Sequence, residues 1–360
     1  MNTQTENKAS ATNILLKKGL IIAGPCSAEN EEQLVQTAME LSALGKVDVL
    51  RAGIWKPRTN PGGFEGVGTK GLPWLLKAKK LTGLQTAVEV ASPKHIEDAL
   101  SFDVDVLWIG ARTTVNPFSI QQIADALKGT DKTVLIKNPV NPDLKLWIGA
   151  IERLNKAGVY KLGLIHRGFS SYGNTQYRNA PMWQIPIEMK RLYPSIRMLC
   201  DPSHICGNAL GLLSVSQKSL DLDYDGLIIE SHCDPANALT DSEQQIKPEQ
   251  LGVMLNKLVP KNSTSHEDGI IRTLENLREQ IDNLDEEMIS LIANRMKIAK
   301  EIGEIKKKGQ ITVLQSTRYN EILTRLINKG NSMGLSEKFI GSCMEAIHLE
   351  SIRIQNKINC

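Results

Sequence analysis

The stretch Leu20–Ser27 reads Leu-Ile-Ile-Ala-Gly-Pro-Cys-Ser, an apolar run that ends at a turn and a thiol. A short apolar run without polar alternation is typical of a parallel strand that is covered by helices. The turn contains Pro25, so it does not match the G-x-G-x-x-G pattern of a doubly wound dinucleotide-binding sheet. The stretch therefore predicts a parallel strand with Cys26 just beyond its carboxyl end.

Similar runs recur as far as residue 258. The strands they predict are Leu20–Gly24, Val49–Ala52, Gln85–Val90, Val106–Ile109, Thr133–Lys137, Lys161–Ile165, Met198–Cys200 and Gly226–Glu230. Between them lie amphipathic helical stretches such as Glu31–Leu44, Pro117–Leu127, Asp143–Ala157 and Pro181–Leu192. Eight strand-then-helix units in about 240 residues predict an α/β fold of the (β/α)₈ TIM barrel type, which usually takes about 250 residues. A doubly wound open sheet is the alternative.

The sequence changes character after this repeat. Residues 260–269, PKNSTSHEDG, are polar and predict a linker between a barrel domain, 1–259, and an all-α domain, 270–360. Apolar residues recur at helical spacing from Ile270 to Lys308, and further helices are expected over Ser316–Lys329 and Ser336–Asn356. At 1.5 Å per residue the first helix would be roughly 57 Å long, too long for so small a domain to bury alone, which predicts a homodimer.

Composition narrows the class of protein. The 360 residues are 41% hydrophobic and carry a net charge of +3, which argues against a nucleic-acid-binding surface. No apolar stretch is long enough to span a membrane, and Met1–Ser10 lacks the apolar core of a signal peptide, so a cytoplasmic protein is expected. Six cysteines in such a protein are expected to be thiols or metal ligands.

Cationic side chains follow the predicted strands at one phase of the repeat. They are Arg51, Lys56, Arg58 (next to Thr59), Arg112, Lys137 and Arg167. The carboxyl ends of barrel strands meet on one face, where active sites form, so these groups are expected to converge. So many cations need anionic ligands, which predicts two substrates bearing phosphate or carboxylate groups, or one highly charged substrate. Taken singly, each cation is more typical of a solvated surface.

Four other residues form a mixed ligand set for a divalent transition metal. Cys26, His204, Glu230 and Asp241 supply a thiolate, an imidazole and two carboxylates. The first three follow or end a predicted strand, and Asp241 lies on the loop beyond the last one. A nucleophilic Cys26 is the alternative, although no nearby His-Asp arrangement would activate it.

Together these motifs resemble those of the 3-deoxy-D-arabino-heptulosonate 7-phosphate (DAHP) synthases. In family order they are Gly24–Ser27, Arg51–Thr59, Gly110–Thr113, Lys137–Pro139, His166–Gly168, Asp201–His204, Glu230–His232 and Leu239–Asp241. The resemblance spans about Leu20 to Leu258. It implies condensation of phosphoenolpyruvate with erythrose 4-phosphate, the first step of the shikimate pathway. The related synthase that uses arabinose 5-phosphate is the nearest competitor, and the run Lys56–Thr59 favours the erythrose 4-phosphate enzyme.

The resemblance also implies roles for the residues. Cys26, His204, Glu230 and Asp241 would bind Mn²⁺, Fe²⁺ or a similar ion, which polarises the aldehyde. Phosphoenolpyruvate would be held by Arg51, Lys56, Arg112, Lys137 and Arg167, and erythrose 4-phosphate by Arg58 and Thr59. Lys56 would also be catalytic, protonating or stabilising the new alkoxide. Glu89 or His232 would handle the attacking water.

The helical segment resembles the all-helical chorismate mutases over about Leu274 to Gln355. The residues that carry this resemblance include Arg278, Arg295, Lys306, Arg318, Ser351 and Gln355. Arg295 and Lys306 are eleven residues apart and so share a helix face, whereas Arg278 points elsewhere and, as the family implies, would reach a second subunit's site. Rearranging chorismate to prephenate needs a dicarboxylate clamp and a cation at the ether oxygen, which implies catalytic roles for Arg295 and Lys306.

Two positions depart from the mutase pattern. Tyr319 stands where the family often has an acidic residue, and Gln315 where some members have Asp, which bears on mutase efficiency. The chain is expected to be a bifunctional transferase and isomerase. In the alternative, the helical domain is mainly a dimerising allosteric sensor of prephenate or chorismate, and its cations are surface charges of a coiled coil.

Overall fold

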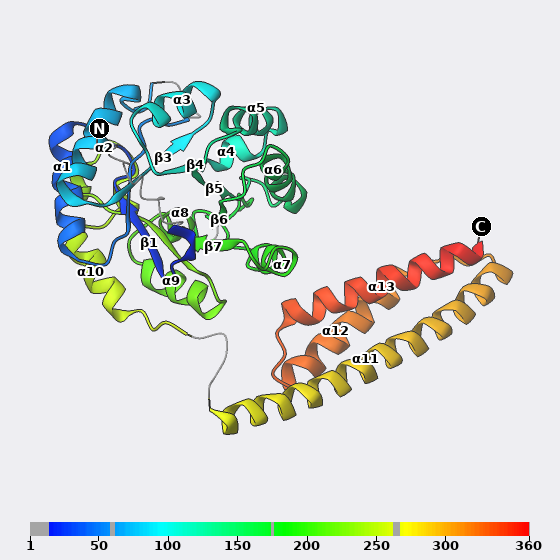
Figure 1. Cartoon of the computed structure of the whole chain (residues 1–360). Coiled ribbons are helices and arrows are strands. Elements are labelled where there is room, and N and C mark those ends of the chain that lie inside the picture. The colour runs from blue at the N-terminus through cyan, green and yellow to red at the C-terminus, as the bar shows by residue number, and fades with distance from the viewer. Residues whose placement is uncertain (1–13, 58–61, 174–175, 262–266, 360) are drawn as a thin grey trace, which may run out of the picture. The chain divides into compact units, whose positions relative to one another are not determined.

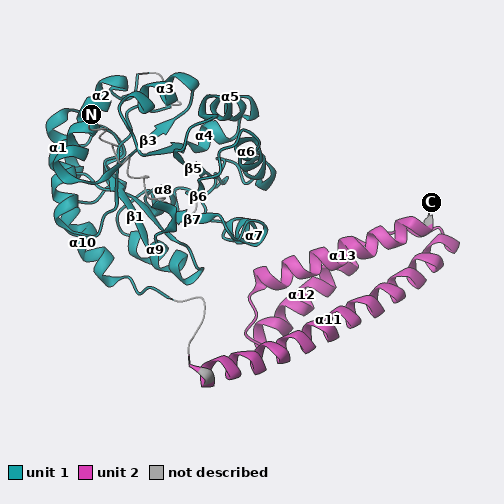
Figure 2. Cartoon of the chain, viewed as in Figure 1, with its two compact units in different colours: residues 1–263 teal, residues 264–360 magenta. Residues whose placement is uncertain are grey.

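A computed structural model of the chain describes residues 14–57, 62–173, 176–261 and 267–359. The chain divides into two compact units, residues 1–263 and 264–360 (Figure 2). The first unit contains all the strands described, and the second contains only helices. The predicted linker, 260–269, falls partly outside the described residues, and the helix expected from Ile270 begins slightly earlier, at Asp268.

Eight parallel strands close into a barrel in chain order (Figure 1). They are β1 (Leu20–Gly24), β2 (Val49–Arg51), β3 (Gln85–Val90), β4 (Val106–Ile109), β5 (Thr133–Lys137), β6 (Leu162–His166), β7 (Arg197–Cys200) and β8 (Gly226–Glu230). The ring is closed by β1 and β8, which pair from Leu20 opposite Gly226 to Gly24 opposite Glu230. The predicted TIM barrel is therefore confirmed, and the open sheet is ruled out.

Helices surround the barrel. They are α1 (Glu31–Ala43), α2 (Gly71–Thr82), α3 (Pro93–Ser101), α4 (Ala111–Thr114), α5 (Pro117–Leu127), α6 (Leu144–Lys156), α7 (Gln184–Leu192), α8 (Pro202–Cys206), α9 (Leu212–Asp221) and α10 (Pro248–Lys257), with short 3₁₀ turns η1 (Ile14–Leu16), η2 (Gly68–Lys70), η3 (Pro235–Asn237) and η4 (Ser242–Gln244). Side-chain caps fix several helix starts. The Asn30 side chain accepts the Gln33 N–H at 2.9 Å, for example.

Helix α7 begins three residues later than the sequence predicts. Ala180 pairs with Phe169 in an isolated antiparallel bridge, and Met182 has a positive φ of 39°. A residue in that conformation cannot belong to a right-handed helix, so the helix starts only at Gln184. The segment before α7 is therefore a folded-back loop, which passes close to the carboxyl end of the barrel.

Two apolar cores hold the barrel. One lies between strands and helices and includes Leu50, Ile136 and Trp147. The other fills the barrel interior with residues such as Ile22, Trp108 and Ile228, and Leu15 of η1 joins it. Because the interior is packed with side chains, functional groups lie at the strand ends and not in a central channel.

The second unit consists of α11 (Asp268–Lys308), α12 (Ser316–Ser332) and α13 (Glu337–Asn359). All three helices were expected, with α12 and α13 ending three residues later than predicted. Helix α11 leaves a ridge of apolar side chains exposed, including Leu277, Ile281, Leu284 and Leu291, which are 51 to 70% accessible. Among the described residues, no helix combines the length and apolar character that crossing a membrane would require.

Candidate functional site

The four residues predicted to bind a metal come together as two pairs. Cys26 Sγ lies 3.2 Å from Asp241 Oδ2, and His204 Nε2 lies 3.8 Å from Glu230 Oε1. Arg51 connects the pairs, because its guanidinium lies 3.3 Å both from Glu230 Oε1 and from the Cys26 carbonyl oxygen. Within the described ranges, no three His, Cys, Asp or Glu residues are yet close enough to enclose an ion.

His204 is oriented as a metal ligand would be. Its Nδ1 donates to the buried carboxylate of Asp201 at 2.9 Å. Burial lowers the pKa of His204, so the ring is neutral and its Nε2 carries a lone pair that faces Glu230. Glu230 Oε1 is buried and accepts no hydrogen bond from the described residues. An imidazole fixed by a carboxylate and aimed at an acidic oxygen, which accepts no hydrogen bond and has the Arg51 guanidinium 3.3 Å away, fits a divalent ion.

Cys26 is a buried thiol beside a lysine. Burial, followed by the charge of Glu230, raises the pKa of Cys26 to about 12. Lys56 Nζ lies 2.5 Å from Cys26 Sγ and 2.8 Å from its carbonyl oxygen. At neutral pH the thiol therefore keeps its proton unless a cation displaces it, as a metal ion would. The raised pKa also counts against a free nucleophilic thiolate.

A buried ion pair holds Lys137, and a hydrogen bond to an amide holds Arg167. Lys137 Nζ lies 2.8 Å from Asp201 Oδ2, and both side chains are almost wholly buried. Arg167 Nη1 donates to Asn179 at 2.7 Å, and burial lowers the pKa of Arg167 to about 10, with further contributions from the nearby charges of Arg178 and Arg112. The structure thus brings Lys137, Arg167 and Arg112 to neighbouring strand ends. Arg58 and Thr59 lie outside the described residues.

Of the two residues expected to handle water, Glu89 lines a cavity together with Lys56. Glu89 accepts a hydrogen bond from Trp108 Nε1 at 3.0 Å and lines a cavity of about 230 Å³ together with Lys56 and His95. His232 has other partners, because its Nδ1 accepts the Asp234 N–H at 2.8 Å and its Nε2 lies 3.7 Å from Glu29.

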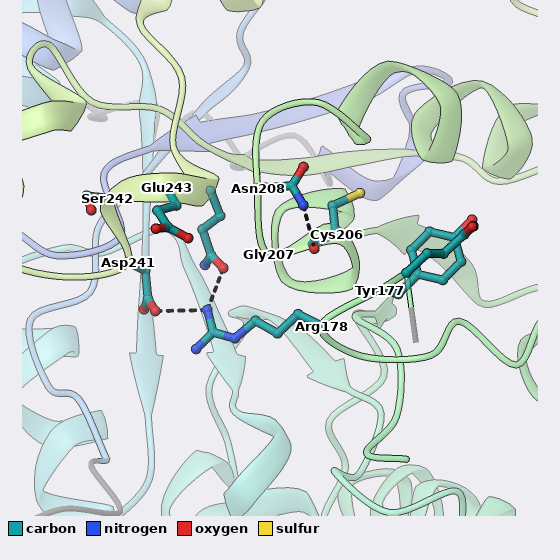
Figure 3. Close-up of a pocket in the computed structure, with 10 residues that line it drawn as sticks. Tyr177, Arg178, Cys206, Gly207, Asn208, Asp241, Ser242 and Glu243 are labelled. Carbon is teal, nitrogen blue, oxygen red and sulfur yellow. Dashed lines mark hydrogen bonds and ion pairs between the residues drawn. The ribbon is translucent and has the colours of Figure 1, made fainter. Parts of the chain in front are cut away.

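Three residues that the sequence did not single out touch the candidate ligands. Arg178 Nη1 donates to Asp241 Oδ1 at 2.9 Å and to Gln244 Oε1 at 2.6 Å, beside an open cavity of about 600 Å³ (Figure 3). Asn179 Nδ2 donates to the His204 carbonyl oxygen at 2.6 Å. No periodic pattern marks these positions, because Arg178 and Asn179 lie on the folded-back loop before α7 and Gln244 lies in the short turn η4 beyond β8.

The helical unit has a cationic cavity of about 380 Å³. It is lined by five of the predicted residues, Arg295, Lys306, Arg318, Ser351 and Gln355, together with Gln315, Tyr319 and His348. Arg295 Nη1 donates to Ser351 Oγ at 2.6 Å, and Lys306 Nζ donates to the Val313 carbonyl oxygen at 2.7 Å. No acidic residue is among the described residues that line this cavity, and Arg278 is not among them either.

Tyr319 stacks on His348 within this cavity, and the sequence did not indicate that contact. The ring centroids are 4.1 Å apart and the planes are 25° from parallel. Burial, then the charges of Arg295 and Lys306, lowers the pKa of His348. Its Nε2 is buried without a hydrogen-bond partner among the described residues. A neutral imidazole thus joins the cations of the cavity.

Comparison with known proteins yields two family matches. Residues 10–265 match the model of the DAHP synthetase I family, and residues 277–356 match chorismate mutase type II. A phospho-2-dehydro-3-deoxyheptonate aldolase of Thermotoga maritima is 32% identical over 226 residues, covering 63% of this chain and 64% of the relative. A 2-dehydro-3-deoxyphosphooctonate aldolase of Nitratidesulfovibrio vulgaris is 26% identical, covering 70% of this chain and 95% of that protein.

Solved structures agree with the barrel. The crystal structure of the DAHP synthase from Thermotoga maritima has a TM-score of 0.59 and 29% identity, covering 66% of this chain and 67% of that one. A truncated form of the Thermotoga synthase has a TM-score of 0.57 and 27% identity, covering 66% of this chain and 84% of that one. This chain therefore spans about two thirds of the full-length relative.

Proposed function

Because this chain belongs to the DAHP synthetase I family and carries a type II chorismate mutase domain, we propose that it catalyses two reactions. The barrel condenses phosphoenolpyruvate with erythrose 4-phosphate to DAHP and phosphate, and the helical unit rearranges chorismate to prephenate. The observation that carries the first activity is the buried network in which Lys137, Asp201, His204, Glu230 and Arg51 are successive neighbours. It presents cations next to a donor set that suits a metal ion.

Erythrose 4-phosphate is favoured over arabinose 5-phosphate as the aldehyde. The heptonate aldolase of Thermotoga is 32% identical to this chain, whereas the phosphooctonate aldolase of Nitratidesulfovibrio is 26% identical. The motif Lys56–Thr59 supports the same choice. In this proposal Arg58 and Thr59 bind erythrose 4-phosphate, and Arg51, Lys56, Arg112, Lys137 and Arg167 bind phosphoenolpyruvate.

The proposed reaction joins C3 of phosphoenolpyruvate to the aldehyde carbon, and water adds to C2 as phosphate leaves. Lys56 Nζ contacts Cys26 Sγ, and the side chain lines a cavity together with Glu89. It is therefore the candidate to donate a proton to the new alkoxide. Arg51, Lys137 and Arg167 hold the phosphate and carboxylate of phosphoenolpyruvate. Glu89 is the better candidate to accept the proton of the attacking water.

Synthases of this family generally depend on a metal ion. We propose that Cys26, His204, Glu230 and Asp241 hold a divalent ion such as Mn²⁺ or Fe²⁺. When bound, the ion supplies Lewis-acid polarisation of the aldehyde oxygen. His204 is already neutral and oriented for this role, whereas Cys26 must lose its proton.

An assay of phosphoenolpyruvate consumption tests the barrel activity. Erythrose 4-phosphate should support consumption and arabinose 5-phosphate should not, and a chelator should abolish the activity until Mn²⁺ is restored. Preference for arabinose 5-phosphate would contradict the assignment of erythrose 4-phosphate as the substrate. Full activity after complete chelation would contradict the proposed metal site.

The cationic cavity carries the mutase proposal. Arg295 and Arg318 would clamp the substrate dicarboxylate with the help of Ser351 and Gln355, while Lys306 stabilises the charge that develops on the ether oxygen. The alternative, a helical unit that only senses prephenate or chorismate, is not favoured. It would gain support if the full chain failed to convert chorismate yet bound prephenate.

We also propose a homodimer through α11 and the boundaries 1–259, 260–269 and 270–360 for barrel, linker and mutase. The exposed ridge of α11 supports the dimer. Arg278 lies about 26 Å along the helix from Arg295, so it would serve the site of a second copy. Sedimentation of a Leu284→Glu variant, with Glu301→Lys on the same helix as control, tests the dimer. We expect only Leu284→Glu to sediment as a monomer, and an unchanged dimer in that variant would contradict the proposal.

Since both proposed barrel substrates are phosphorylated metabolites, we place the protein in the cytoplasm.

A further inference from the structure

The loop between β6 and α7 lies against the helix that carries His204. The Arg178 and Asn179 N–H groups donate to the carbonyl oxygens of Cys206 and Ile205 at 3.4 and 3.2 Å. Gly207, with a φ of +71°, allows this contact, because a Cβ there would lie 2.5 Å from the Arg178 Cβ. The backbone thus fixes where the Arg178 side chain begins.

From that position Arg178 holds one candidate ligand directly and a second through a glutamine. Its Nη1 donates to Asp241 Oδ1 at 2.9 Å and to Gln244 Oε1 at 2.6 Å, as the dashed lines in Figure 3 mark. Gln244 Nε2 in turn donates to Glu230 Oε2. One guanidinium therefore connects carboxylates from the end of β8 and from the loop beyond it.

These bonds engage the outer oxygens of both carboxylates, and the inner oxygens face the other two candidate ligands. Asp241 Oδ2 faces Cys26 Sγ at 3.2 Å, and Glu230 Oε1 faces His204 Nε2 at 3.8 Å. Arg178 and Gln244 hold the opposite oxygens, Oδ1 and Oε2. A hydrogen bond to the outer oxygen of a carboxylate fixes the direction of its inner oxygen. Arg178 and Gln244 therefore orient the two carboxylates toward the proposed ion and do not occupy the oxygens that would bind it.

We propose that Arg178 and Gln244 are positioning residues of the metal site, which aim Asp241 and Glu230 at the ion. The neighbouring Asn179 adds a link, because it holds the His204 carbonyl oxygen and the Arg167 guanidinium together. One loop thereby sets three of the four ligands and a phosphate-binding arginine. This assignment rests on the proposed metal site.

Titration of the full chain with Mn²⁺, with free Mn²⁺ followed by electron paramagnetic resonance, tests the assignment without any reaction. Arg178→Ala should weaken Mn²⁺ binding by about 10- to 100-fold, the usual cost of losing a support of a metal ligand. Gln244→Ala, which leaves the Arg178–Asp241 pair intact, should weaken it less. Arg178→Lys should recover part of the loss, because an ammonium can still donate to Asp241, whereas a loss of packing alone would not be recovered this way.

Two controls separate this assignment from the metal site. His204→Ala removes a ligand and should weaken binding more than Arg178→Ala does. Arg153→Ala, at an exposed arginine that also donates to a glutamine side chain, should bind Mn²⁺ like the wild type. Unchanged or tighter binding by Arg178→Ala, with His204→Ala impaired, would overturn the positioning role and leave the metal site standing. A wild type that fails to bind Mn²⁺ would overturn both.

Discussion

The two units place their cations in opposite surroundings. In the barrel, Lys137 and Arg51 are buried and each is matched to a buried carboxylate, Asp201 or Glu230. In the helical unit, Lys306 and Arg318 line a cavity that has no acidic residue among its described lining, and the ion pair that Arg318 makes with Glu321 is exposed. A charge buried in apolar surroundings needs a counter-charge within the folded protein. A charge at the edge of a small helical bundle is partly solvated and can remain unpaired until an anionic ligand binds. The charged residues of the barrel site therefore also stabilise the barrel fold. Those of the helical site contribute little to the stability of the helical unit.

Removing one barrel carboxylate should have the largest effect. Asp201→Asn leaves Lys137 buried without its counter-charge, and its single amide oxygen cannot accept from both Lys137 and His204, which should cost about 3 to 5 kcal/mol of unfolding free energy. Glu321→Gln, at the exposed pair of the helical unit, should leave stability unchanged. Thermal unfolding followed by circular dichroism measures both. Equal losses of unfolding free energy in the two variants would contradict the contrast between the ion pairs of the barrel and those of the helical unit.

A change at Lys306 should separate function from stability. Lys306→Ala should lower kcat for chorismate by about 10²- to 10³-fold, because it removes the cation at the developing negative charge. The unfolding transition of the helical unit and the synthase rate should stay as in the wild type. Lys307→Ala, at the next position, is the matched control. Unchanged turnover in Lys306→Ala would remove it from the catalytic residues.

Acid should destabilise the barrel before the helical unit. Burial lowers the pKa of His166 to about 4, with Tyr224 and Pro181 bonded to its two ring nitrogens. The neutral ring stabilises the fold fully above the unfolded pKa of about 6.5, and this contribution, about 3 kcal/mol, is lost as the pH falls toward 4. Urea unfolding of the barrel from pH 7 to pH 4 measures it. In His166→Gln the pH dependence should be shallower.

The smallest effect is expected at the stacked pair of the helical cavity. Tyr319→Leu should remove the support of the His348 ring and cost about 1 kcal/mol of transition-state binding, seen as a roughly fivefold loss in mutase kcat/KM. Tyr319→Phe keeps the stack and should be close to the wild type. A large loss in Tyr319→Phe would instead assign a role to the hydroxyl group.

The regular parts of the molecule were predictable, and the irregular parts were not. The strand-then-helix repeat predicts parallel strands, whose carboxyl ends meet on one face of a barrel. The sequence therefore predicted that Cys26, Lys137 and Glu230 lie on the same face. Arg178 and Asn179 stand on a loop whose path depends on tertiary contacts. One of these is the bridge between Phe169 and Ala180, and another is Gly168, whose φ of +77° lets the chain pass close to Asn179. Local sequence patterns do not encode such contacts.

Closure of the ring by β1 and β8 also bears on synthesis of the protein. Cys26 leaves the ribosome early, yet its partners Glu230 and Asp241 follow more than two hundred residues later. At about 5 to 20 residues per second, the thiol and the first strand edge stay uncovered for roughly 10 to 40 seconds. Until β8 arrives, a nascent barrel exposes an unpaired edge and an oxidisable cysteine. We expect this chain to need protection by chaperones before its site can form.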